Sequence, residues 1–167
     1  SVIDGGDTEA QITGYIGSNH KISVPENVSI SGVSYKVAKI ANEAFKGTSL
    51  IEVRLPDSVL EVGDGAFADC KALAKVMLSN SLTAVNKSSF SGCTALKEMN
   101  LSDNIVEIED GAFENTGLET LELPKYLMKI GSRAFAGSAL NELSVPDTVN
   151  HIGENAFKAS SLKINAY

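Results

Sequence analysis

This 167-residue chain contains no tryptophan, and cysteine and histidine occur only twice each. An active site needs several reactive groups close together, yet His20 and His151 lie near opposite ends of the sequence and neither cysteine has a histidine nearby. The sequence motifs of phosphate-binding loops, serine hydrolases and zinc proteases are also missing. We therefore expect no catalytic residue, no metal site, no cofactor and no enzymatic activity.

Basic residues are also scarce, because 14 Lys and Arg stand against 21 Asp and Glu and give a net charge of −7. Nucleic-acid binders concentrate Lys and Arg on one face, and anionic lipid surfaces attract the same residues. No apolar run approaches the roughly 20 residues that cross a bilayer. We expect neither nucleic-acid binding nor membrane insertion. No signal segment opens the chain, but Ser1 is typical of a trimmed start, so secretion remains open.

A repeat runs through the chain instead. The six phenylalanines recur every 22 or 23 residues, at Phe45, Phe67, Phe90, Phe113, Phe135 and Phe157. A fixed period of this length is typical of a solenoid, in which each coil packs only on its neighbours. With 43% hydrophobic and 21% charged residues, the composition is that of an ordinary globular protein.

Within each coil, aliphatic residues alternate after the phenylalanine, as at Leu73, Val76 and Leu78. This alternation predicts a short strand that pairs in parallel with the next coil. A second short strand is expected at Val59 to Val62 and its equivalents. The segment before each phenylalanine is too short for an independent helix, so we expect one helical or 3₁₀ turn there. The repeat glycines Gly63, Gly131 and Gly153 are interpreted as turn residues.

The N-terminal region departs from the repeat. Residues 1–8 are expected to form a flexible leader. Two alternating runs, Ile12 to Ile16 and Ile22 to Val24, flank Ser18-Asn19 and predict a hairpin. Residues 9–39 would then be a hairpin and an irregular coil that covers the open end of the stack.

Residues 40–167 are expected to form five full coils and one partial coil. The chain stops part-way through that last coil, where an uncovered strand would favour aggregation. Either Tyr167 and a short tail cover it, or the natural protein continues, and we favour the second.

Cys70 and Cys93 each lie three residues after a phenylalanine, so they occupy equivalent positions in adjacent coils. Strands in neighbouring coils are about 4.8 Å apart, which is more than the roughly 3.8 Å between the Cβ atoms of a disulfide. We therefore favour two buried free thiols over a disulfide. The other coils carry small polar residues at this position, namely Thr48, Thr116, Ser138 and Ser160.

The outward-facing residues of the first strand form two exposed columns, which are the candidate ligand face. One column is Glu52, Lys75, Glu98, Thr120 and Glu142, and the other is Arg54, Met77, Asn100, Glu122 and Ser144. The face is interpreted in two ways: charges that pair weakly between coils, or a binding surface such as solenoids often carry. Binding hot spots favour Trp, Tyr and Arg, and the face offers only Arg54, so pairing is favoured for any single residue.

A third column has an acidic character and consists of Asp57, Asn80, Asp103 and Asp147, interrupted by Lys125. A cation would find carboxylates there. Carboxylates next to turns usually stabilise the turns themselves, and we expect that role here.

The complete repeat pattern is clearest from Ile130 to Pro146, IGSRAFAGSALNELSVP. It resembles the BspA-like leucine-rich repeats, also called the Treponema pallidum type. The resemblance extends over about Ile12 to Ile164 and differs from commoner leucine-rich repeats in lacking an asparagine ladder.

The fold that follows is α/β: a right-handed leucine-rich-repeat solenoid of 22–23-residue coils, mostly short parallel strands with single helical turns, and an N-terminal β-hairpin cap. The resemblance implies a secreted or surface-attached bacterial protein that adheres to host or matrix proteins. We expect a monomeric, non-catalytic module at the cell surface or outside the cell, with a protein or glycan as ligand. The alternative is a structural spacer within a larger surface protein.

Overall fold

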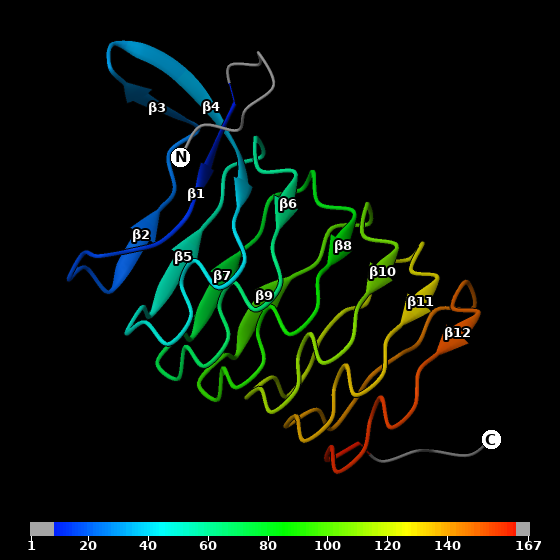
Figure 1. The fold of residues 1–167 in the computed structure, drawn as a ribbon. Coiled ribbons are helices and arrows are strands. Elements are labelled where there is room, and N and C mark those ends of the chain that lie inside the picture. Colours follow the sequence, from blue (N-terminus) through cyan, green and yellow to red (C-terminus); the bar gives the residue numbers. More distant parts are fainter. Residues whose placement is uncertain (1–8, 163–167) are drawn as a thin grey trace.

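Successive coils of the chain stack along one axis in the computed structural model, which describes residues 9–162 (Figure 1). Each coil supplies short strands to the walls of the solenoid, and the apolar side chains fill the space between them. The expected leader (1–8) and the end of the last coil (163–167) lie outside the described residues. No described residue is helical, so the fold is a β-solenoid and not α/β.

One wall is a sheet of four parallel strands in the order β2-β5-β7-β9. These strands are β2 (Lys21–Ser23), β5 (Glu52–Arg54), β7 (Lys75–Met77) and β9 (Glu98–Asn100). Their register places Val53 beside Val76, and both side chains are buried. The alternation in the sequence therefore predicted both the strands and the side chains that point inward.

The opposite wall is built from two-residue strands. They are β6 (Glu61–Val62), β8 (Ala84–Val85), β10 (Glu107–Ile108), β11 (Lys129–Ile130) and β12 (His151–Ile152). The last four form a parallel sheet in the order β12-β11-β10-β8, while β6 pairs with β4 of the N-terminal region. The second strand expected at Val59 to Val62 is thus present, limited to its last two residues.

The N-terminal hairpin lies in a different place from the one predicted. It joins β3 (Asn27–Ile30) to β4 (Val33–Ile40) through Ser31-Gly32 and projects from the coils (Figure 1). Both turn residues have positive φ, 53° and 82°, as a type I′ hairpin turn requires. The prediction that Ile12 to Ile16 pairs with Ile22 to Val24 was wrong because each run belongs to a different wall.

The first coil follows from that correction. β1 (Glu9–Ile12) pairs in parallel with β4, and β2 pairs in parallel with β5, so both extend the walls by one coil. Tyr15 packs against Phe45 with ring centroids 6.2 Å apart. The tyrosine thus takes the place of a repeat phenylalanine at the N-terminal end of the ring column.

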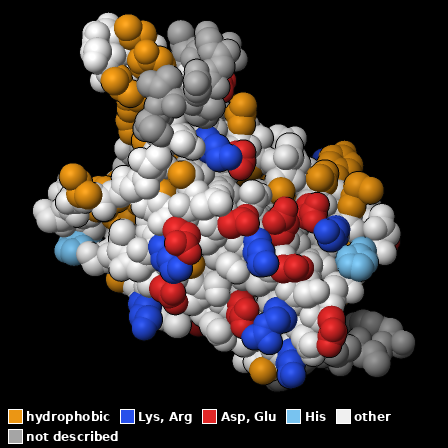
Figure 2. Space-filling view, in the orientation of Figure 1, with side chains coloured by type: hydrophobic (Ala, Val, Ile, Leu, Met, Phe, Trp, Pro, Cys, Tyr) orange, Lys and Arg blue, Asp and Glu red, His pale blue; other side chains and the backbone are white. Residues whose placement is uncertain are grey.

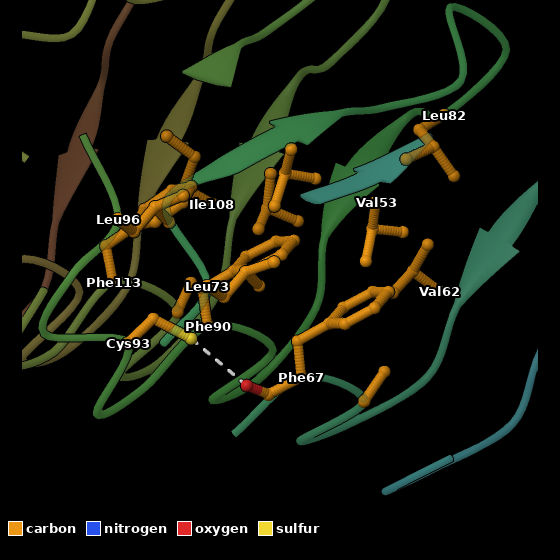
Figure 3. Packing of buried hydrophobic residues seen from close by; sticks show 14 of the residues in the cluster. Val53, Val62, Phe67, Leu73, Leu82, Phe90, Cys93, Leu96, Ile108 and Phe113 are labelled. Carbon is orange, nitrogen blue, oxygen red and sulfur yellow. Dashed lines mark hydrogen bonds between the residues drawn. The ribbon is translucent and has the colours of Figure 1, made fainter. Parts of the chain in front are cut away.

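The six phenylalanine rings form a continuous column inside the solenoid. Successive ring centroids are 5.0 to 5.7 Å apart and the ring planes are within 14° of parallel. Figure 3 shows Phe67, Phe90 and Phe113 in sequence, surrounded by the leucines and valines of the walls. The first five rings are buried, whereas Phe157 in the last coil is partly exposed. Burying one such side chain contributes about 1.5–3 kcal/mol.

The expected helical turns are replaced by stacked turns at the phenylalanine corner. Around Phe45, every second N–H donates to the next coil: Glu43 N to Asp64 O, Phe45 N to Ala66 O and Gly47 N to Ala68 O, at 2.8–2.9 Å. A helix would direct all of its N–H groups along its own axis. The residues two before and two after each phenylalanine also have positive φ, which ends any right-handed helix. These residues are Glu43, Gly47, Gly65, Asp69, Ser88, Gly92, Gly111, Asn115, Arg133, Gly137, Asn155 and Ala159.

The glycines that precede these corners are needed for close approach between coils and not for turning. At Gly131, an added Cβ would lie 2.5 Å from Asp110 N and 2.6 Å from Glu109 C. Gly63 and Gly153 meet the backbone of the preceding coil in the same way, and none of the three has a positive φ. Their interpretation as turn residues was therefore wrong.

Replacing Phe113 with alanine should lower the free energy of unfolding by about 3–5 kcal/mol, because the ring is buried between two neighbours. Phe157→Ala should cost clearly less, since that ring is partly exposed and stacks on Phe135 alone among the described rings. Urea unfolding monitored by circular dichroism measures both values. Equal losses in the free energy of unfolding for the two variants would show that burial within the ring column does not determine the stability.

Gly131→Ala should destabilise the fold by about 3 kcal/mol, because backbone atoms of the preceding coil must move. Gly47→Ala is the control: its φ is +67° but no atom lies within 4 Å of the added Cβ, so only the left-handed backbone cost of about 1–2 kcal/mol applies. The same urea experiment compares them. A Gly131→Ala protein as stable as the Gly47→Ala protein would rule out the close-approach explanation.

Candidate functional site

The first predicted column lies on the outer surface of the β2-β5-β7-β9 sheet, and its charges alternate from strand to strand. Lys21 Nζ lies 3.0 Å from Glu52 Oε2, and Lys75 Nζ lies 2.6 Å from Glu98 Oε2. The hydrogen bond that the Lys75 ammonium donates to the Glu98 carboxylate, together with the charge of that carboxylate, raises the pKa of Lys75. These side chains are exposed, so each pair contributes little to stability. Their alternation supports the interpretation in which the column's charges neutralise one another.

The same kind of pairing joins neighbouring coils elsewhere on the surface. The further pairs are Lys39 with Glu61, Lys97 with Glu119, Lys125 with Asp103, Lys129 with Glu107, and Arg133 with Glu114. Figure 2 shows acidic and basic side chains mixed over the face in view and not gathered by sign.

The C-terminal part of the predicted face is less regular. Thr120 and Glu142 form an isolated parallel bridge, and within residues 9–162 no strand contains Glu122 or Ser144. All four side chains are exposed, and neither glutamate pairs with a basic residue of the described chain. The face therefore consists of an ordered sheet over the first coils and a looser continuation beyond them.

The second predicted column leads into a groove of about 860 Å³. Arg54, Met77 and Asn100 end β5, β7 and β9 and line this groove. Its other wall comes from Glu26 and Lys36 at the base of the β3–β4 hairpin. A volume of this size lies within the range of small-ligand sites. The structure thus brings the second column together with residues that the sequence analysis did not select.

Glu26, Lys36 and the buried Ser58 are the groove residues that the sequence analysis missed. The sequence analysis placed the hairpin at Ile12 to Val24, so it did not predict that Glu26 and Lys36 line the groove. A signal for the true hairpin was present: Ser31-Gly32 lies between Val28, Ile30, Val33 and Tyr35, which is a hairpin pattern with a favourable turn.

The acidic column is occupied by structural hydrogen bonds. Asp57 Oδ1 accepts the Asn80 N–H at 2.8 Å, and Asp103 Oδ1 accepts the Lys125 N–H at 3.0 Å. Each carboxylate therefore holds the backbone of the next coil, as expected for a turn-stabilising role. Among the described residues, no group of three or more His, Cys, Asp or Glu side chains could hold a metal ion.

The histidines and cysteines lie apart from the groove. His20 Nδ1 lies 3.0 Å from Ser49 O in the first coils, and His151 begins β12 at the other end of the stack. Cys70 and Cys93 are buried free thiols, and their Sγ atoms donate to Phe45 O and Phe67 O (Figure 3 shows the second bond). The hydrogen bond with Cys70 and burial raise the pKa of the Cys93 thiol, which makes it a poor nucleophile.

The pKa of the Asp103 carboxyl lies below its ordinary value, mainly because the carboxylate accepts a hydrogen bond from the Lys125 backbone N–H. The Lys125 ammonium lowers the pKa further, by a smaller amount. A lowered pKa in the folded state stabilises the protein above the unfolded-state pKa of about 4, and this contribution is lost as the pH falls through the folded-state value.

Asp103→Ala should therefore be less stable than wild type at pH 7, and the difference should shrink as the pH falls below about 4. Asp147→Ala is the matched control, because Asp147 occupies the same repeat position and makes no hydrogen bond recorded within residues 9–162. Thermal unfolding measured between pH 2 and 7 tests this. A constant stability difference for Asp103→Ala across that range would show that its charge is irrelevant.

Comparison with known proteins connects this fold to bacterial repeat proteins. The BspA type leucine rich repeat region matches residues 38–163 in six copies. No curated protein matches the chain. Within the described residues, no helix is long and apolar enough to cross a membrane.

Solved structures give the same relationship. A leucine rich cell surface protein from Faecalibacterium prausnitzii is 27% identical with a TM-score of 0.74; the match covers 96% of this chain but only 51% of that one. A leucine-rich repeat protein from Bacteroides capillosus is 32% identical over 70% of this chain and 88% of its own, with a TM-score of 0.64. The T. pallidum leucine rich repeat protein is 27% identical over 91% of this chain and 60% of its own, with a TM-score of 0.56.

Proposed function

The chain belongs to the BspA type leucine-rich repeat family, and from this premise we propose that it is a non-catalytic ligand-binding module of a bacterial surface or secreted protein. The ligand is a protein or a glycan of the host or matrix, and the module binds it as a monomer. Support for the location comes from the Faecalibacterium prausnitzii relative, which is a cell surface protein.

The observation that carries the proposal is the groove beside the strand face. Arg54, Met77 and Asn100 line it from three successive coils, so a ligand in the groove would contact several coils at once. The remaining face residues, Thr120, Glu122, Glu142 and Ser144, continue the same surface and would contact a larger ligand.

One observation favours a second function, that of a structural spacer. The column of Lys21, Glu52, Lys75 and Glu98 is neutralised by its own pairs, so this part of the face offers few free charges to a partner. A spacer needs a stable rod and no ligand, and the ion pairs and hydrogen bonds between coils would suffice for that.

Binding to an array of purified extracellular-matrix proteins and glycans separates the two functions. The groove variant Arg54→Glu/Asn100→Ala should lose at least tenfold in affinity for whatever the wild type binds, since it alters exposed groove residues. The control exchanges an inter-coil pair on the opposite wall, Lys129→Glu/Glu107→Lys, which lies outside the strand face and should bind like wild type. Both proteins must retain the wild-type melting temperature.

Two outcomes would count against the binding function at this site. If the wild type binds nothing on the array, the spacer function is favoured. If it binds and the groove variant binds equally well, the ligand contacts another surface.

A further inference from the structure

Three charged side chains of the groove, those of Arg54, Lys36 and Glu26, form no ion pair, unlike the paired column of Lys21, Glu52, Lys75 and Glu98. Arg54 lies between Ser23 and Met77 in the strand register, and neither neighbour can form an ion pair with it. Lys36 and Glu26, across the groove, form no ion pair with any described residue either. Elsewhere, lysines and glutamates pair from one coil to the next. Asp57 also lines the groove, but its carboxylate accepts hydrogen bonds from Asn80. The groove therefore offers two cations and the Glu26 carboxylate as groups without a side-chain partner.

Ser58 supplies a second and independent indication. It is 6% exposed, it lines the groove, and its Oγ has no hydrogen-bond partner in the described structure. Three of its four equivalents reach the preceding coil: Ser81 Oγ donates to Asp57 O, Asn104 Nδ2 to Asn80 O, and Thr148 Oγ1 to Lys125 O. The fourth equivalent, Tyr126, is exposed.

The irregular first coil explains why Ser58 is unpaired. After Glu26 the chain leaves the stack as the β3–β4 hairpin, and the Glu26 carbonyl accepts the Val37 N–H of that hairpin at 2.8 Å. Leaving a buried hydroxyl unpaired is unfavourable. A ligand acceptor in the groove would satisfy it. The base of the hairpin thus contributes Glu26 and Lys36 to one wall of the groove, and the unpaired Ser58 hydroxyl lies in the same lining.

The rest of the lining suits a peptide better than a sugar. The groove residues include the apolar Leu55, Met77, Leu78 and Leu101, which can contact aliphatic side chains. None of its lining residues is aromatic, so the groove offers no ring on which a sugar could stack. Asn100 and Glu26 can accept hydrogen bonds from the N–H groups of an extended backbone.

We infer that the groove binds an extended peptide segment that carries carboxylate side chains, held by Arg54 at the end of β5 and by Lys36 within β4. Arg54 receives a carboxylate through its planar guanidinium, which can form two parallel hydrogen bonds. Ser58 donates to a ligand oxygen, and Met77 with Leu78 contacts the aliphatic part. This assignment rests on the proposed binding function and names the ligand chemistry of the same site.

The test uses defined probes and the full 167-residue chain. A fluorescently labelled Ser-Leu-Glu repeat peptide of nine residues is titrated against the protein, alongside its Ser-Leu-Gln analogue. An oligogalacturonate represents the acidic glycan. We expect the Glu peptide to bind and the Gln peptide to bind at least tenfold more weakly. Binding should weaken as salt rises from 50 to 500 mM.

Variants locate the binding. Arg54→Gln and Lys36→Gln should each weaken the Glu peptide, Arg54→Gln by about tenfold or more, and Ser58→Ala should weaken it less. Lys97→Gln is the matched control: it removes an exposed lysine of the same solenoid outside the groove and should bind like wild type. The Met77 methyl resonance should shift when the peptide is added, which places the ligand without any substitution.

Three results would overturn the inference. They are equal affinity for the Glu and Gln peptides, binding of oligogalacturonate but of neither peptide, and Glu-peptide binding that leaves both Arg54→Gln and the Met77 resonance unaffected. If the array experiment shows groove-dependent binding while no probe peptide binds, the binding function stands and only the ligand assignment fails.

Discussion

Registration between successive coils is the constraint on which every other feature depends. Each coil is too small to bury its own apolar side chains or to pair its own strand edges. Its apolar side chains are therefore buried against the neighbouring coils, and its strands pair with theirs. Backbone N–H groups such as those of Phe45 and Phe67 donate to carbonyls of the following coil, and the phenylalanine rings stack along the same direction. The period of 22 or 23 residues keeps both sets of contacts in register. The longer first coil still pairs β2 with β5, because its additional residues leave the stack as the β3–β4 hairpin.

The same registration determines what the surface can do. Because equivalent residues stand beside one another in parallel strands, a Lys above a Glu forms a pair, and a column of alternating sign neutralises itself, as Lys21, Glu52, Lys75 and Glu98 do. The β3–β4 hairpin interrupts the repeat, and the unpaired side chains of Arg54, Lys36, Glu26 and Ser58 line the groove beside it. The candidate site therefore lies at the N-terminal end of the stack of coils.

Much of the fold was predictable from the sequence because its information is periodic. The phenylalanine column, the parallel strands, the buried thiols of Cys70 and Cys93, and the turn-stabilising carboxylates of Asp57 and Asp103 all follow from one register. Predictions were wrong in two places. One is the backbone conformation at the corners, which the repeat spacing does not specify, and the other is the N-terminal region, which does not follow the repeat. Helical turns were expected at the corners, but their N–H groups bond to the next coil. The hairpin was assigned to Ile12 to Val24, although those runs form separate walls.

The coil length, the identity of the core and the exposed columns of the strand face can be predicted without a structure, because they depend on which residues recur and at what spacing. Which of the exposed residues remain available depends on how the coils pack. Pairing between coils removes Glu52, Lys75 and Glu98 from the free charges, and the path of the hairpin brings Glu26 and Lys36 to Arg54. Such proximity between the non-repeating start of the chain and the strand ends of later coils depends on three-dimensional geometry, which a one-dimensional period does not encode.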